Sequence, residues 1–136
     1  MKSTKEKQID LIGLLIDEMC LDIKKYSELQ YLASDNYSKE ILRGIHLDKT
    51  KHKSLLEEIY KSISGDFPSK PVSSLNQILD YKKQLQKNIL DETDNSRFFG
   101  DLYMAFDNTP YLTPLSVIIN DLHNHALINL YLYLKV

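Results

Sequence analysis

The sequence predicts an all-α protein, a single four-helix bundle built from two helical hairpins. Apolar residues recur at three- and four-residue steps along almost the whole chain, and the alternation typical of strands is absent. The chain also contains an internal repeat, in which the segment of about residues 9–64 is similar to the segment of about residues 75–136. A segment with two prolines separates these two halves. A length of 136 residues is enough for one sizeable core, so we assign residues 1–136 to one domain.

The internal repeat is visible in two pairs of segments. DIKKYSELQYLA (22–33) aligns without gaps with DNSRFFGDLYMA (94–105), and both contain an Asp, an aromatic residue, a Tyr and an Ala at matching places. IHLDKTKHKSLLEEIY (45–60) aligns with IINDLHNHALINLYLY (118–133), and both contain an Ile, an Asp, a His and a Tyr at matching places. The interval from the leading Asp to the His is 30 residues in the first half and 31 in the second. Two copies of one helical unit predict two similar hairpins.

The first hairpin is predicted from its end signals. A helix of about 4–34 begins with a capping box that starts at Ser3. The turn that follows is short, so the next helix, of about 38–64, should return antiparallel to the first. Gly65 then closes that helix as its C-terminal cap.

A long connection follows between the second and third predicted helices. The segment GDFPSKPVSS (65–74) has two prolines and no helical pattern. Such a chain is extended, at about 3.1 Å per residue, so ten residues reach about 30 Å. This is the length of a helix of about 20 residues, so the connection can cross the whole bundle.

The second hairpin is predicted in the same way as the first. Ser74 begins a capping sequence, and the third helix then extends to about 106. The segment DNTPYLTP (107–114) is the next loop, in which Thr113 fits an N-cap followed by a proline at the first helical position. The fourth helix extends from about 114 to the end of the chain.

Polar residues interrupt the apolar face of each predicted helix. Asp22 follows Met19 by three residues, Asp94 follows Leu90 by four, and His52 and His125 lie in the apolar series of the second and fourth helices. Burying such groups costs free energy unless they are hydrogen bonded or bind a metal. Two further carboxylates each precede a histidine by four residues and could serve it across one helical turn, namely Asp48 and Asp121.

This pattern resembles the ferritin-like superfamily in its short rubrerythrin-type form, over residues of about 10 to 135. That family has a Glu on its first and third helices and Asp-Glu-x-x-His on its second and fourth. DKTKH (48–52) and DLHNH (121–125) occupy the two Asp-Glu-x-x-His positions. The resemblance implies a ferritin-like bundle with a metal site in its centre. The implied ligands are Asp22, His52, Asp94 and His125, with Glu92 as a rival to Asp94 and with Asp48 and Asp121 behind the histidines.

Two positions depart from the family pattern. In the family, the Glu of each Asp-Glu-x-x-His bridges two iron ions, and here those positions hold Lys49 and Leu122. Lys49 brings a positive charge to a place that should neutralise two cations, and Leu122 has no donor atom. Oxygen or peroxide chemistry at a di-iron centre is therefore disfavoured.

Three hypotheses for function follow from these residues. The favoured one is a metal-free, non-catalytic structural or partner-binding protein, in which Lys49 pairs with Asp22 or Asp94. The alternative is a mononuclear site for iron, zinc or manganese, made by the two histidines with Asp22 and Asp94. A di-iron oxidoreductase is the least favoured of the three. The sequence thus leaves enzymatic activity open and favours its absence.

Composition restricts the environment and the partners. The net charge is −2, with 17 basic and 19 acidic residues scattered along the chain, so no basic patch for nucleic acid is predicted. No apolar run approaches the roughly 18 residues of a membrane span, and no signal peptide is visible, so we expect a cytoplasmic protein. The richness in Lys, Ile, Asn and Tyr indicates a bacterial source with an AT-rich genome. The C-terminal NLYLYLKV is apolar on more than one face, which predicts a contact in a homodimer. We also expect a protein partner whose identity the sequence does not give.

Overall fold

The computed structural model describes residues 1–70, 74–106 and 110–136, and these residues form four helices and no strand. The helices follow one another as α1 (Thr4–Leu32), α2 (Asn36–Ser64), α3 (Tyr81–Ala105) and α4 (Leu112–Lys135). The predicted all-α four-helix bundle is therefore confirmed. No helix among the described residues is both long enough and apolar enough to cross a membrane.

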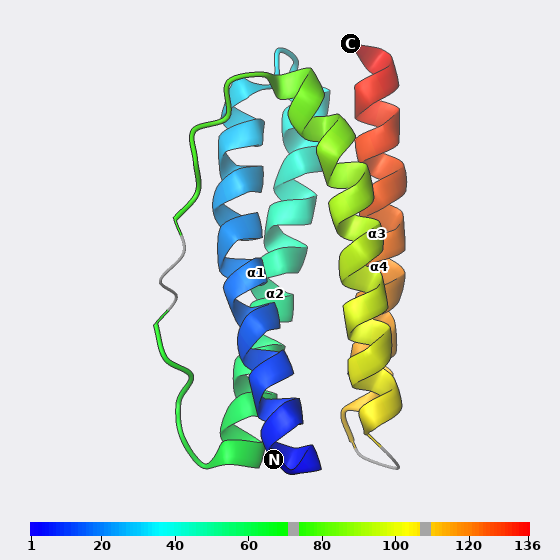
Figure 1. Cartoon of the computed structure of the whole chain (residues 1–136). Helices are drawn as coiled ribbons and strands as arrows, with labels where there is room; N and C mark the ends of the chain where they lie inside the picture. Colours follow the sequence, from blue (N-terminus) through cyan, green and yellow to red (C-terminus); the bar gives the residue numbers. More distant parts are fainter. Residues whose placement is uncertain (71–73, 107–109) are drawn as a thin grey trace.

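The helices are arranged as two antiparallel hairpins (Figure 1). α1 packs mainly on α2 and α3 mainly on α4, while α1 also contacts α3 and α2 also contacts α4. The connection from α2 to α3 begins at one end of the bundle and reaches α3 at the opposite end, as the sequence predicted (Figure 1). As a result α2 and α3 run in the same direction, and so do α1 and α4. Residues 71–73 of this connection lie outside the described residues.

Two predicted helix ends are confirmed by their hydrogen bonds. The Ser3 hydroxyl accepts a hydrogen bond from the backbone N–H of Glu6 at 3.1 Å, which satisfies one free donor of the first turn of α1. Gly65 ends α2 in the left-handed region, with φ of 78°, and its N–H donates to the carbonyl of Lys61 at 2.9 Å. A residue with a Cβ is disfavoured in this conformation, which explains the glycine.

The start of α3 differs from the prediction. The helix begins at Tyr81, with Asp80 as the N-cap that accepts from the N–H of Lys83 at 3.0 Å, so the predicted start at Ser74 is wrong. The extended connection instead continues to the cap. The backbone N–H of Ile78 donates to the Glu28 side chain of α1 at 3.0 Å, and the Ile78 side chain is buried. This contact with α1 holds the segment out of the helix.

The start of α4 also differs from the prediction. The helix begins at Leu112, and its N-cap Tyr111 makes no side-chain capping hydrogen bond. Thr113 and Pro114 lie inside the first turn, where a proline is tolerated because its missing N–H would have no intrahelical partner. The prediction of Thr113 as N-cap is therefore wrong. Residues 107–109 of the preceding loop lie outside the described residues.

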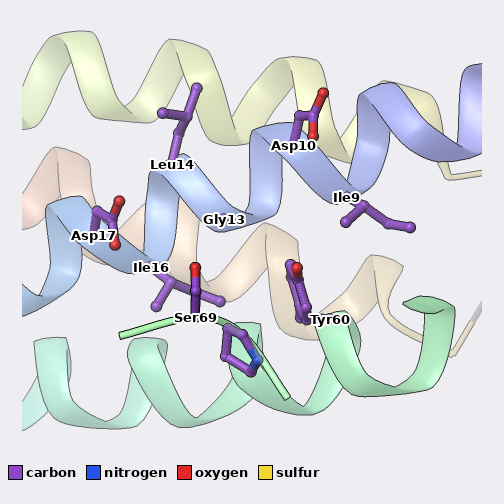
Figure 2. A pocket seen from close by; sticks show the side chains of 9 residues that line it. Ile9, Asp10, Gly13, Leu14, Ile16, Asp17, Tyr60 and Ser69 are labelled. Carbon is purple, nitrogen blue, oxygen red and sulfur yellow. The ribbon is translucent and has the colours of Figure 1, made fainter. Parts of the chain in front are cut away.

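A small cavity lies where the connection passes α1 and α2. It has a volume of about 330 Å³ and is bordered by Gly13 and Ile16 of α1, Tyr60 of α2, and Pro68 and Ser69 of the connection. Figure 2 shows Tyr60 facing α1 beside the passing segment with Ser69. The connection thus packs beside both helices of the first hairpin.

The core consists of two apolar clusters at different heights along the bundle. One cluster includes Met19 of α1, Leu56 of α2 and Phe99 of α3. The other cluster includes Leu29 of α1 and Leu42 of α2. On every helix the residues between these clusters include buried polar side chains, so a polar layer separates the two apolar halves of the core.

Candidate functional site

Each of the four helices contributes charged or polar side chains to the buried layer. We define this charged layer as the following six buried side chains: Asp22 and Tyr26 from α1, Lys49 and His52 from α2, Glu92 from α3 and His125 from α4. Such groups persist in a core only when they are hydrogen bonded or ion-paired with one another. Their contacts therefore define what the layer can do.

Lys49 lies at the centre of the charged layer and has 0% of its surface exposed. Its Nζ atom donates to Oε2 of Glu92 at 2.6 Å and lies 3.3 Å from Oδ2 of Asp22. Two carboxylates from two other helices thus surround one ammonium group. Removing Lys49 would leave the buried Glu92 carboxylate without its ammonium partner, which is more costly than burying the complete set.

Glu92 connects Lys49 to a buried tyrosine. Burial alone would raise the pKa of Glu92, but the Lys49 ammonium and His125 outweigh burial and lower it to about 2. The hydroxyl of Tyr26 donates to Oε1 of Glu92 at 2.6 Å, and it accepts from the Asn129 amide at 2.9 Å. Burial and the neighbouring Glu92 carboxylate raise the pKa of Tyr26 well above 10.0, so its hydroxyl keeps its proton and remains a donor.

The two histidines form symmetric pairs between α2 and α4. Nε2 of His52 donates to Asp121 of α4 at 2.8 Å, and Nε2 of His125 donates to Asp48 of α2 at 2.8 Å. Each histidine therefore bonds the Asp of the other helix, and the pairing that the sequence also allowed, with the Asp four residues before it, is not formed. The two rings are stacked, with centroids 6.1 Å apart. Burial, together with Lys49, lowers the pKa of His52, which favours its neutral form.

Three buried electron-pair donors in the layer lack a hydrogen bond to any described residue. They are Nδ1 of His52, Nδ1 of His125 and Oδ2 of Asp22. Nε2 of His52 carries the proton that Asp121 accepts, so Nδ1 of the neutral His52 ring presents a lone pair. Nδ1 of His125 lies 3.8 Å from Oε2 of Glu92. Oδ2 of Asp22 still faces the Lys49 ammonium. A hydrogen-bond donor or a cation could satisfy these atoms.

The structure brings together three of the four predicted ligands. Asp22, His52 and His125 all reach the layer, whereas the side chain of Asp94 is 61% exposed and lies 3.9 Å from the Arg97 guanidinium. The expectation that Asp94 points inward is therefore wrong. Glu92, its rival, is the α3 carboxylate in the layer.

The error at Asp94 has a simple geometric cause. Leu90, Asp94 and Phe98 form a stripe at four-residue spacing, but this stripe faces outward, and both of its apolar members are exposed. Residues 92 and 94 are separated by about 200° around a helix, so only one of them can face the core. The inward stripe is instead Leu85, Asn88, Glu92, Ser96 and Phe99.

Several residues of the site were not predicted from the sequence. Lys25 forms an ion pair with Asp22 at 3.0 Å, and the buried Asn88 donates to Asn129 at 3.0 Å. Asn129 follows His125 by four residues and precedes Leu132 by three, so the helical spacing contained the signal for it. The partner of a buried polar residue on another helix is not marked by any local pattern.

Metal binding is limited by the position of Lys49. No group of three or more His, Cys, Asp or Glu side chains among residues 1–70, 74–106 and 110–136 is arranged to hold a metal ion. Leu122 is buried in an apolar cluster and offers no ligand atom. The layer therefore does not fit a di-iron centre, because the Lys49 ammonium lies between its two carboxylates, 2.6 Å from Glu92 and 3.3 Å from Asp22. No family model, no curated protein and no solved structure matched this chain.

Proposed function

We propose that this chain is a ferritin-like bundle in which the Lys49 ammonium takes the place of the metal ions, and that it is a non-catalytic protein that binds a protein partner, namely a second copy of itself. One observation carries the proposal: the Lys49 Nζ atom lies between the Glu92 and Asp22 carboxylates in the middle of the bundle. Two unit charges about 4 Å apart interact by about 4 kcal/mol at an effective dielectric constant of about 20. A divalent cation beside this ammonium would meet about twice that repulsion.

The ferritin-like assignment is supported by the arrangement of helices and side chains. Two antiparallel hairpins are joined by a connection that spans the bundle (Figure 1). The carboxylates of Asp22 and Glu92 come from α1 and α3, and the imidazoles of His52 and His125 come from α2 and α4. With Glu92 in place of Asp94, the third helix contributes the residue type that the resemblance expects. A bundle of this topology normally builds its sites from inward side chains on facing helices.

A protein-binding role is supported by the outward face of α4. The only Asp, Glu, Lys or Arg residues between Leu112 and Lys135 are Asp121, which bonds a buried histidine, and the terminal Lys135. Large apolar side chains on this helix are exposed, namely Val117, Leu127, Leu130, Tyr131 and Leu134. Depletion of charge and enrichment in large apolar and aromatic residues are typical of the core of a protein interface.

The occupant that we propose for this face is a second copy of the chain. Leu127, Tyr131 and Leu134 fall on one stripe with four- and three-residue spacing, which is the pattern of a helix–helix seam, and Val117 lies ten residues before Leu127 on the same side of the helix. A helix of 24 residues is about 36 Å long, so two such helices could meet over their whole length.

The second candidate function is a mononuclear metal site, which one specific observation favours. Nδ1 of His52, Nδ1 of His125 and Oδ2 of Asp22 make no hydrogen bond to a described residue, and they are nitrogen and oxygen donors of the kind that iron, zinc or manganese accepts. For such a site to form, Lys49 would have to lose its proton or leave the layer. The first proposal needs neither change.

Metal analysis separates the two candidates. We expect protein purified without chelator and soaked with Zn²⁺, Mn²⁺ or Fe²⁺ to contain no stoichiometric metal. Lys49→Met should instead take up about one ion per chain, because the layer then has carboxylates and imidazoles without a cation. Lys51→Met is the matched control, since Lys51 is exposed on the same helix.

Two results would count against these proposals. About one metal per chain in the unchanged protein, lost in both His52→Ala and His125→Ala, would favour the mononuclear site. No uptake by a folded Lys49→Met variant would argue against the ancestral metal-site geometry. Light scattering at micromolar concentration tests the proposed homodimer, and a single monomeric species would contradict it.

A further inference from the structure

A groove lies between α1 and α3, next to the end of the connection. It has a volume of about 720 Å³, and Ser74, Leu75, Asn76 and Gln77 of the connection line one side. Ligand sites in proteins are commonly clefts of about 300 to 1,000 Å³. The groove is thus large enough for a small molecule, and its walls indicate which kind.

The groove has an excess of negative charge. Five carboxylates line it, from Asp17, Glu18, Asp22, Asp91 and Asp94. Only two ammonium groups do so, and that of Lys25 is already engaged by Asp22 at 3.0 Å and Asp91 at 3.8 Å. Burial raises the pKa of Glu18, and the neighbouring Asp22 carboxylate adds to this effect. A positive charge is therefore the group that this groove lacks.

An uncharged polar side chain in the same groove also lacks a partner. Asn95 is only 6% exposed, it lines the groove, and its amide has no hydrogen bond to any residue that the structure describes. The amide oxygen can accept a hydrogen bond from a ligand N–H, so this residue indicates a bound donor independently of the carboxylates.

The remaining walls of the groove are apolar and extended. Leucines of α1 and Phe98 of α3 line it, and both Leu14 and Phe98 are substantially exposed. The lining residues of α1 extend from Leu11 to Lys25. Along a helix this interval corresponds to about 21 Å. Carboxylates alternating with apolar side chains over such a length suit an extended ligand rather than a compact ion.

We propose that this groove binds an elongated aliphatic polyamine, with its ammonium groups on the carboxylates and on Asn95 and its methylene segments on the leucines and Phe98. Ion pairs alone would not distinguish such a ligand from other cations, whereas the apolar walls select for methylene chains. The site lies on α1 and α3 and uses neither Lys49 nor the outward face of α4. Asp22 is shared with the charged layer and is already paired with Lys25 and Lys49, so the carboxylates left for the ligand are those of Asp17, Glu18, Asp91 and Asp94. The variants below change only groove residues outside the charged layer, so their result does not depend on the proposed function.

The test is calorimetric titration of the full chain with spermine at an ionic strength of about 0.15 M. We expect saturable binding of about one spermine per chain, and weaker binding of the shorter diamine putrescine. Asp17→Asn combined with Glu18→Gln should weaken the binding of spermine by about tenfold or more, as should Asn95→Ala, because each loses charge-assisted hydrogen bonds. Asp101→Asn is the control, since Asp101 is exposed on α3 and does not line the groove.

Three outcomes would overturn the proposal. One is binding of spermine that does not reach saturation. Another is equal binding of Mg²⁺ at the same concentration of charge, which would reveal simple ion attraction to an acidic surface. The third is an equal loss of affinity in Asp101→Asn. Circular dichroism of each variant identifies any loss of fold. Asp17 and Glu18 are not buried, so their conservative double substitution should disturb the packing of the core least.

Discussion

Lys49→Met is the substitution that tests the charged layer most directly. Methionine has nearly the length of lysine and fits an apolar core, so the variant removes the ammonium with little change in packing. It leaves the Glu92 and Asp22 carboxylates buried without the cation that lies 2.6 Å and 3.3 Å from them. Breaking a buried ion pair on one side typically costs about 3–5 kcal/mol.

The pKa of Glu92 gives a second measure of the same effect. It is lowered from 4.5 to about 2, with the Lys49 ammonium as the main favourable cause. At about 1.4 kcal/mol per pKa unit, this shift corresponds to about 3 kcal/mol in favour of the carboxylate. Without Lys49, burial should instead raise the pKa of Glu92. The loss of stability should therefore be large near pH 7 and smaller near pH 5, where Glu92 begins to be protonated.

Urea denaturation followed by circular dichroism measures this loss at both pH values and at one fixed protein concentration. The control is again Lys51→Met, which should change the free energy of unfolding by less than about 0.5 kcal/mol. Adding Glu92→Gln to Lys49→Met should restore part of the stability, because one buried charge is then removed. A loss below about 1 kcal/mol for Lys49→Met, or one equal to the control, would refute the buried ion-pair account.

Three further predictions concern the layer and the face of α4. Because the pKa of Glu92 is below its ordinary value, its contribution is complete above about pH 4.5 and lost as the pH falls towards 2. The pKa of His52 is also lowered, so protonation of His52 below about pH 6.5 opposes folding. The urea concentration at the unfolding midpoint should therefore fall as the pH is lowered. A midpoint that does not change with pH would contradict both pKa shifts. Tyr26→Phe should cost about 1–3 kcal/mol in the same assay, unlike Tyr31→Phe at an exposed position. Leu127→Asp should convert a dimer to a monomer in light scattering with unchanged helicity, and a persistent dimer would exclude the α4 face.

The general architecture was predictable because its signals are local. Apolar spacing identifies four helices, and Gly65 and the proline-containing connection mark the end of the first hairpin. The start of α3 was not predictable in this way. A capping sequence at Ser74 competes with the contact between Ile78 and Glu28 of α1, which are 50 residues apart in the chain. The contact across the fold prevailed over the local signal.

The sequence predicted most of the residues that form the candidate site, but not which of them bond to each other. Helical spacing placed Asp22, His52 and His125 in the core, and it offered both Glu92 and Asp94 on the third helix. The internal repeat favoured Asp94, because it aligns with Asp22, but the two helices present their aligned faces differently. Which carboxylate each histidine meets depends on how the two hairpins are placed against each other, and the sequence does not specify this locally.

The charged layer also explains how the two hairpins keep one relative position. Lys49 and Tyr26 of the first hairpin both bond Glu92 of the second, and the histidines exchange carboxylates between α2 and α4. The apolar clusters on either side of the layer would more easily tolerate a displacement of one hairpin along the other, since dispersion contacts have little directionality. A slide by one helical turn, about 5.4 Å, would leave several buried polar groups without partners. Because the ammonium is covalently part of α2, it holds α2 in one position relative to the carboxylates of Asp22 on α1 and Glu92 on α3.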